Sequence, residues 1–123
     1  MQLDLNPQIH AALSLLEQGS TSAFITGRAG TGKSTLLRYF QQTATRPVVV
    51  LAPTGVAALN VRGETIHSFF RFSPGITVAE AERRAAQLRH AALYKSFRTL
   101  IIDEISMVRA DLLDCVDVFL RTV

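Results

Sequence analysis

The segment Gly27-Arg28-Ala29-Gly30-Thr31-Gly32-Lys33-Ser34 determines how the rest of this sequence is interpreted. Four residues separate Gly27 from the Gly32-Lys33-Ser34 triplet, which is the spacing of a phosphate-binding loop (P-loop). Glycines let the backbone turn so tightly that successive amide hydrogens point at phosphate oxygens, and the following helix adds the positive end of its dipole. We therefore expect the loop to bind a nucleoside triphosphate, with ATP and Mg²⁺ as the expected ligands.

Each side chain of the loop has an expected role. Lys33 is expected to reach the β and γ phosphates as a point charge, and the Ser34 hydroxyl is expected to bind the metal ion. Thr31 and Thr35 can equally act as local capping or packing groups. The alternative, a glycine-rich loop without a ligand, is disfavoured because the pattern falls between an apolar run and a helical run. The predicted nucleotide-binding residues are Gly27, Ala29, Gly30, Thr31, Gly32, Lys33, Ser34 and Thr35.

Three short apolar runs predict buried strands. They lie at residues 22–26, just before the loop, at residues 48–51, and at residues 100–102. Each run is continuous rather than alternating, which is typical of strands that are covered on both faces of a parallel sheet.

Helical spacing of apolar residues separates these runs. Strands that alternate with helices predict an α/β fold, a parallel sheet flanked by helices, in one domain over residues 1–123. Gly19 is expected to close the first helix in a left-handed conformation. Glu80 and Arg84 are expected to pair on the exposed side of the third helix. The apolar faces are expected at Ile9, Ala12, Leu13 and Leu16, at Leu36, Leu37 and Phe40, at Ala81, Ala85, Leu88 and Ala92, and at Leu112, Leu113, Val116 and Leu120.

Asp103 and Glu104 directly follow the third predicted strand. Open α/β sheets bind ligands beyond the carboxyl ends of their strands, so two acidic residues there indicate a cation and a reaction. Asp103 is expected to hold Mg²⁺ through water, and Glu104 to polarise the attacking water as a general base. A solvated strand end without a metal ion is the alternative interpretation. Together with Lys33, these two residues form the predicted catalytic set.

Composition restricts the remaining possibilities. The chain has 123 residues, is 48% hydrophobic and carries a net charge of +3, with eleven arginines among its 13 basic residues. This weak basic bias permits nucleic-acid contact without requiring it. The sequence contains no secretory signal and no apolar run long enough to span a membrane. A single cysteine, Cys115, fits an intracellular protein of the cytoplasm or nucleoid.

Three stretches together go beyond a general P-loop protein. They are residues 26–35, residues 52–61 with Thr65-Ile66-His67-Ser68, and residues 101–108, which read Ile-Ile-Asp-Glu-Ile-Ser-Met-Val. In order and spacing they resemble motifs I, Ia, Ib and II of the Pif and RecD type of superfamily one DNA helicase. The resemblance implies a RecA-like P-loop NTPase fold. It also implies an ATP-driven motor that moves five-prime to three-prime on single-stranded DNA and unwinds duplexes, in repair, replication or recombination.

The resemblance also implies a path for single-stranded DNA. The family places the segment from Ala52 to Leu59 along the strand, and Thr65 and His67 match its Thr-Ile-His segment. Physically, Gly55 allows close backbone approach and the Thr54 hydroxyl can donate to a phosphate. Phe69 and Phe70 either stack on bases or belong to the core. The predicted DNA-binding residues are Pro53, Thr54, Gly55, Thr65 and His67.

Two departures from the family pattern limit these expectations. Relatives carry an adenine-reading glutamine near the amino terminus, and here Gln8 competes for that place with His10. Val123 precedes the family's motif III and the second motor domain, so we expect an incomplete motor domain, monomeric and inactive in unwinding by itself. A generic P-loop ATPase or nucleotide kinase, and a nucleotide-regulated module that binds single-stranded DNA, are the alternative functions.

Overall fold

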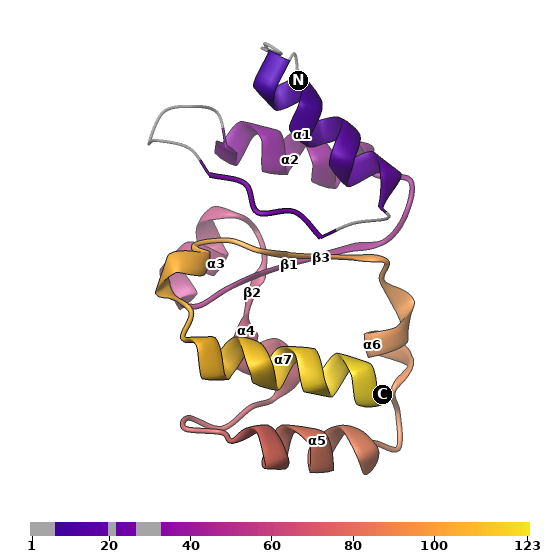
Figure 1. The fold of residues 1–123 in the computed structure, drawn as a ribbon, viewed down its shortest axis with the longest axis vertical. Helices are drawn as coiled ribbons and strands as arrows, with labels where there is room; N and C mark the ends of the chain where they lie inside the picture. The colour runs from indigo at the N-terminus through magenta and orange to yellow at the C-terminus, as the bar shows by residue number, and fades with distance from the viewer. Residues whose placement is uncertain (1–6, 20–21, 27–32) are drawn as a thin grey trace.

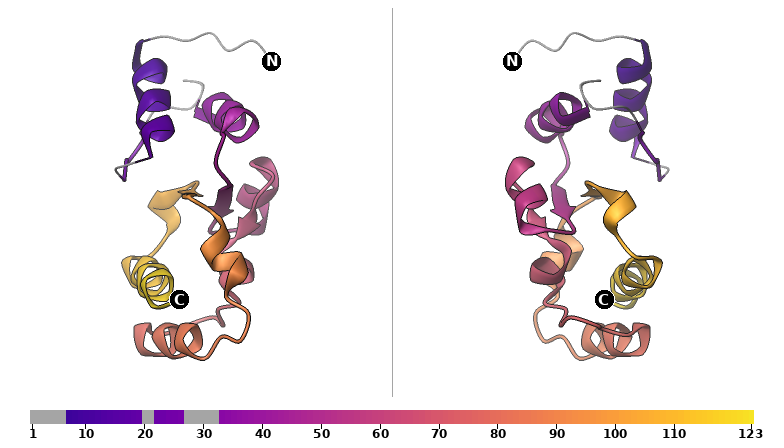
Figure 2. Two further views of the ribbon diagram at one scale, coloured as in Figure 1. Left: turned by 90° about the vertical axis from the view of Figure 1, so that its right-hand side faces the viewer. Right: turned by 90° about the vertical axis from the view of Figure 1, so that its left-hand side faces the viewer.

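The structure, a computed structural model, describes residues 7–19, 22–26 and 33–123, without the side chains of Gln8 and Ser34. Helices lie on both sides of a small sheet (Figure 1). Helices α1 (Pro7–Gln18) and α2 (Lys33–Thr43) cover one face. On the other side lie α7 (Ala110–Thr122) and, beyond it, α5 (Val78–Ala86), and the side views show the same layers (Figure 2). The predicted α/β class is confirmed.

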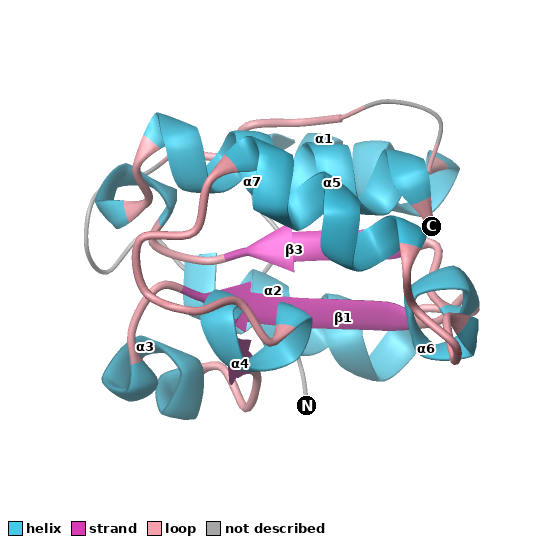
Figure 3. Ribbon diagram, turned by 90° about the horizontal axis from the view of Figure 1, so that it is seen from below, coloured by secondary structure: helices cyan, strands magenta, loops and turns pink. Residues whose placement is uncertain are grey.

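The sheet has three parallel strands in the order β2-β1-β3. They are β1 (Val48–Ala52), β2 (Glu64–Thr65) and β3 (Thr99–Ile102). In Figure 3, β1 and β3 run in the same direction and α3 (Gly55–Asn60) lies beyond their carboxyl ends. Within the described part of the chain, β3 pairs only with β1, so its outer edge has no strand partner.

Side chains on β3 alternate between the two layers of the core, as the strand period of two requires. Ile101 packs against the smaller core cluster, which is built from Leu13, Leu36 and Phe40 on α1 and α2. Leu100 and Ile102 pack against the larger cluster on the opposite face. The strand is therefore covered on both faces, in agreement with its continuous apolar sequence.

Aromatic side chains fill the larger cluster. They come from α4 (Ile66–Phe70), from the turn after it, from α6 (Ala92–Ser96) and from α7. Their rings meet mostly edge to face, the geometry that the ring quadrupoles favour; for example, Phe69 and Phe70 lie 4.9 Å apart at 86°. Phe69 and Phe70 thus belong to the core and are not available to stack on bases. The six aromatic side chains packed together here are Phe69, Phe70, Phe72, Tyr94, Phe97 and Phe119.

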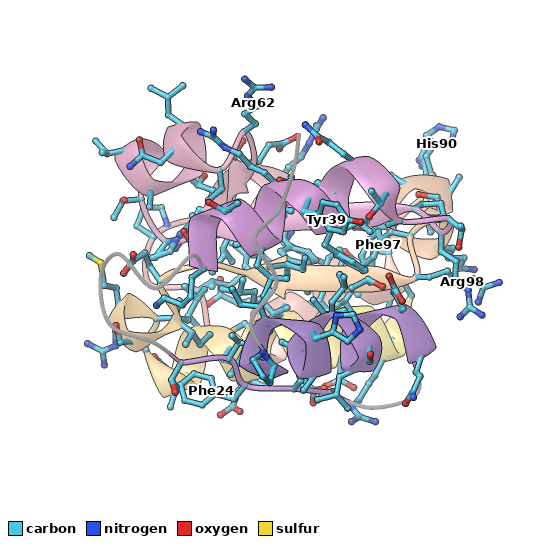
Figure 4. The ribbon with its side chains drawn as sticks, turned by 90° about the horizontal axis from the view of Figure 1, so that it is seen from above. Phe24, Tyr39, Arg62, His90, Phe97 and Arg98 are labelled. Carbon is cyan, nitrogen blue, oxygen red and sulfur yellow. The ribbon has the colours of Figure 1, made fainter. Side chains whose placement is uncertain are left out.

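The strands at 48–51 and 100–102 and the helix closed by Gly19 are confirmed, and Gly19 has a φ of +65°. The strand expected at 22–26 is wrong. These residues form no strand and are exposed, and the Phe24 ring, 74% exposed, points to the periphery (Figure 4). A strand is defined by hydrogen bonds to a neighbouring strand, and residues 22–26 make none with any described strand, although the outer edge of β3 is open.

The helix expected over Ala81 to Ala92 is interrupted. Helix α5 ends at Ala86, and Ala92 begins α6 on an exposed surface. Because the chain breaks between α5 and α6, the Tyr94 ring can enter the aromatic cluster. A continuous helix would have buried the small side chain of Ala92 instead. Tertiary packing has overridden local helix propensity here.

Two expected surface assignments are also wrong. Arg84 does not pair with Glu80: its Nη2 donates to the carbonyl of Phe70 at 3.1 Å, whereas Glu80 accepts from the Thr77 hydroxyl at the start of α5. Leu113 is 40% exposed, so the buried face of α7 is carried by Cys115, Val116 and Phe119.

No helix among the described residues is long and apolar enough to cross a membrane.

Candidate functional site

The carboxyl ends of the three strands meet at one edge of the sheet. Ala52 ends β1 and lies in register with Thr65, which ends β2. On the other side of β1, β3 ends at Ile102 and leads directly to Asp103 and Glu104. This edge is where open α/β sheets bind ligands, and it collects the predicted acidic residues and the predicted DNA contacts.

A cavity of about 780 Å³ runs along the whole of β3 and past its carboxyl end, with residues 22–26 on its other side. Lys33, Asp103 and Glu104 all line it, so the structure brings the predicted catalytic residues around one space. Lys33 begins α2, where the amino-terminal end of the helix carries partial positive charge. The cavity therefore combines a cation, a helix dipole and two carboxylates, which is a suitable setting for a phosphate with its metal ion.

Several residues of the predicted loop lie outside the described part of the chain: Gly27, Ala29, Gly30, Thr31 and Gly32. Ser34 and Thr35 lie in the first turn of α2, next to Lys33, and Thr35 is half-buried. Gln8 and its competitor His10 both lie on α1, where His10 is exposed.

The backbone turns sharply between Asp103 and Glu104. The amide of Asp103 donates to the carbonyl of Leu51 at 2.8 Å, which extends the ladder one residue beyond β3. Glu104 adopts the left-handed conformation (φ 55°, ψ 45°), and a 3₁₀ turn, η1 (Ile105–Met107), follows it. A non-glycine residue in this conformation costs about 1 kcal/mol or more, and Arg62 and Arg71 also adopt it. The turn thus separates two backbone environments, with Asp103 continuing the ladder of β3 and Glu104 starting the 3₁₀ turn.

The predicted DNA contacts lie at the same end of the sheet, where β1 and β2 end. Thr54 and Thr65 both precede short helices, and the two hydroxyls act as matching caps. Thr54 Oγ1 accepts from the Ala57 amide at 3.2 Å, and Thr65 Oγ1 accepts from the Ser68 amide at 3.1 Å. Each hydroxyl keeps its own proton, which is free to be donated to a phosphate oxygen. His67 lies in the first turn of α4 and is half-buried.

Pro53 is half-buried, Gly55 is exposed, and a Cβ built on Gly55 would meet nothing within 4 Å. The chain itself therefore does not require glycine at position 55. A glycine with open space around it is consistent with close approach by another molecule.

Sequence reasoning missed the two caps and the partners of α4. A threonine three residues before an unpaired amide is a recognised helix start, so the pattern could have indicated the Thr54 and Thr65 caps. Nothing in the local sequence points from Arg84 or Tyr94 to the α4 carbonyls that they contact.

The parallel sheet, the helices on both faces and the cavity beside β3, together with the sequence Gly27 to Ser34, define the class: a P-loop protein of the α/β type, present as part of a domain. Comparison with known proteins identifies the family. The sequence model of the PIF1-like helicase family matches residues 6–123, so the chain belongs to that family.

Named relatives agree with this assignment. The chain is 42% identical to the ATP-dependent DNA helicase PIF5 of Trypanosoma brucei brucei over 97% of its own length and 13% of that protein. It is 38% identical to the ATP-dependent DNA helicase Pif1 of Bdellovibrio bacteriovorus, over 87% of this chain and 25% of that one. The chain thus spans a quarter or less of these curated relatives.

Solved structures give the same result. The fold superposes on Bacteroides Pif1 in complex with ADP-AlF4 with a TM-score of 0.84 at 36% identity, covering 98% of this chain and 28% of that one. Bacteroides Pif1 bound to single-stranded DNA gives a TM-score of 0.75 at 34% identity, with the same coverage.

Proposed function

We propose that this chain is the amino-terminal part of the first motor domain of an ATP-dependent DNA helicase. The observation that carries the proposal is that Lys33, Asp103 and Glu104 line one cavity, which runs along β3 to the carboxyl end of the sheet. The nucleotide complex of the Bacteroides relative supports it.

The cavity suits ATP with Mg²⁺. Lys33 neutralises the β and γ phosphates, and the glycine-rich sequence at 27–32, which lies outside the described residues, has the pattern that binds phosphate through backbone amides. Mg²⁺ prefers hard oxygen ligands, and the Asp103 carboxylate with the Ser34 hydroxyl supplies that kind of donor. The ion would neutralise charge on the phosphates, while Glu104, on its left-handed turn, orients and deprotonates the attacking water.

Replacing Lys33 by alanine tests the nucleotide site. We expect the affinity for Mg·ATP, measured by calorimetric titration, to fall at least about tenfold, because a charged hydrogen bond to phosphate is lost. Arg38→Ala is the matched control, because Arg38 is an exposed cation on the same helix that does not line the cavity. Equal affinities for Lys33→Ala and the unmodified chain would contradict the assignment. Glu104→Gln should preserve binding and stop turnover wherever the motor is complete.

We further propose that single-stranded DNA follows the edge formed by Pro53, Thr54, Gly55, Thr65 and His67. The two capping hydroxyls lie at the ends of adjacent strands, so they can donate to phosphates of one extended strand. The Bacteroides Pif1 structure with single-stranded DNA supports this path.

Thr54→Ala and His67→Ala test the path. We expect each to weaken binding of an oligothymidine several-fold, in a nuclear magnetic resonance titration that detects weak complexes. Thr77→Ala is a matched control, since Thr77 caps α5 in the same way but lies in the outer helical layer. If Thr54→Ala and His67→Ala bind DNA as the unmodified chain does, the proposed DNA path along this edge is wrong.

Turnover needs more than these residues. Charge on the γ phosphate in the transition state is stabilised by arginines, which the resemblance places in a second motor domain. We therefore expect the 123 residues alone to bind nucleotide weakly, to hydrolyse it very slowly and not to unwind DNA. Robust DNA-stimulated hydrolysis by these residues would contradict this expectation.

A further inference from the structure

Helix α4 carries His67 and begins directly after Thr65, but it has only five residues. A helix of this length is not stable through its own hydrogen bonds, because nucleation is unfavourable and few bonds follow it. Its position in the fold must therefore be fixed from outside. The Thr65 hydroxyl fixes its amino-terminal end by accepting from the Ser68 amide.

At the carboxyl end of a helix, the last four carbonyls have no intrahelical partner. In α4 these belong to residues 67–70. The chain turns back at Arg71, which is in the left-handed conformation, and local amides reach the first two carbonyls. The Phe72 amide donates to His67 at 2.9 Å, and the Arg71 amide donates to Ser68 at 3.3 Å.

The other two carbonyls are reached by side chains from distant parts of the sequence. The Tyr94 hydroxyl, on α6, donates to the Phe69 carbonyl at 2.8 Å. Arg84 Nη2, on α5, donates to the Phe70 carbonyl at 3.1 Å. All four terminal carbonyls of α4 therefore have a donor, and two of these donors come from other helices.

Both side chains are unusual choices for filling a core. The Tyr94 ring is buried in the aromatic cluster, where phenylalanine would pack equally well apart from the hydroxyl. Arg84 is half-buried, and its Nε is the one buried side-chain nitrogen or oxygen of the described residues without a hydrogen-bond partner. Such a buried donor is destabilising. An apolar side chain at this position would avoid that cost. What the arginine adds in return is its hydrogen bond to the Phe70 carbonyl of α4.

We propose that Arg84 and Tyr94 are positioning residues for single-stranded DNA: they hold α4 so that Thr65 and His67 keep their place beside Thr54. This inference rests on the proposed DNA path. Neither side chain touches DNA, since Tyr94 is buried and the Arg84 guanidinium is directed at α4. Their effect on affinity is transmitted through the two carbonyls.

Two substitutions remove the donors with little change of shape. Tyr94→Phe deletes only the hydroxyl, and Arg84→Met keeps the apolar stem and deletes the guanidinium. We expect each to lower oligothymidine affinity about threefold to tenfold, the scale of one net hydrogen bond. Mg·ATP affinity should remain unchanged. Arg84→Lys retains a donor and should recover part of the DNA affinity.

Val116→Ala is the stability control, because Val116 is a buried residue of the same cluster on α7 and is not a donor to α4. It should lower the melting temperature without changing DNA affinity at a temperature where the protein is folded. Imidazole signals provide a DNA-free readout, as the chain has three histidines. Those of His67 should shift in Tyr94→Phe and Arg84→Met but not in Val116→Ala.

The outcomes are distinguishable. If His67→Ala lowers DNA affinity while Tyr94→Phe and Arg84→Met bind normally and leave the His67 signals in place, the two residues only pack, and the positioning role is wrong. If His67→Ala itself has no effect, the DNA path is wrong and the positioning role fails with it. Reduced affinity and displaced His67 signals in both donor variants, with partial recovery in Arg84→Lys, support the inference.

Discussion

Replacing Gly63 by alanine tests how closely β2 must pack against β1, the two strands whose carboxyl ends carry the proposed DNA contacts. Gly63 immediately precedes β2, and a Cβ built on it would lie 2.2 Å from the Val50 carbonyl oxygen and 2.9 Å from the carbonyl carbon. Both atoms belong to the backbone of the central strand, so no side chain can move aside. The two segments would have to separate by more than 1 Å to reach ordinary contact distance.

The cost can be estimated. Overpacking of this kind destabilises by about 1–3 kcal/mol, and by more where backbone must shift. Against this, replacing glycine restricts the unfolded chain and adds back about 0.4–1 kcal/mol. We expect a net loss of about 2 kcal/mol, or a melting temperature lower by about 8 °C for a domain of this size. Separation of β2 should also displace Thr65 and weaken DNA binding.

Gly55→Ala is the matched control. Its added Cβ would meet nothing within 4 Å, and Gly55 lies in the first turn of α3, where alanine is the better helix former. Urea and thermal unfolding followed by circular dichroism should show Gly55→Ala as stable as the unmodified chain or slightly more so. Unfolding of Gly63→Ala within about 0.5 kcal/mol of the unmodified chain, a typical value for a neutral substitution, would refute the close-packing argument.

Two further predictions concern titrating side chains away from the site. Cys115 is fully buried, and burial raises the pKa of its thiol. The thiol should therefore resist alkylation in the native protein and react only when the protein unfolds. Rapid labelling under native conditions would contradict its placement. The hydrogen bond from Arg109 Nε, at 3.1 Å, lowers the pKa of the exposed Asp111 carboxyl. The stability that this bond contributes is therefore present above about pH 4 and is lost as the pH falls through the lowered pKa. In Arg109→Ala the pKa of Asp111, followed by carboxyl resonance titration, should return toward its ordinary value.

Much of the fold could be predicted because its signals are local. The β-branched run at 48–51 and the apolar run at 100–102 each carry enough information to indicate a covered strand, and Gly19 marks a helix end. Asp103 and Glu104 could be placed for the same reason: residues that directly follow a strand of a parallel sheet lie at the carboxyl end of that sheet.

The errors arise where an element depends on a distant partner. Residues 22–26 have the composition of a strand, but composition does not determine how close the segment comes to a neighbour. They lie across a cavity from the open edge of β3 and do not pair with it. Arg84 lies four residues after Glu80, and helical spacing alone favours that pair. The carbonyl of Phe70, reached through the tertiary fold, proved to be the competing acceptor.

The outer edge of β3, which pairs with no strand in the described residues, has a practical consequence for work on these 123 residues. An edge strand with open amides and carbonyls is a template on which a further strand can add, and apolar edges of this kind promote aggregation. Leu100, Ile101 and Ile102 carry no charge that would oppose such pairing. Protein concentration should therefore be varied in every binding and unfolding measurement. A melting temperature that changes with concentration would show self-association, which strand addition at this edge would produce. A charged residue at Ile101, on the face that packs against α1 and α2, would be a poor remedy because it would disrupt the core.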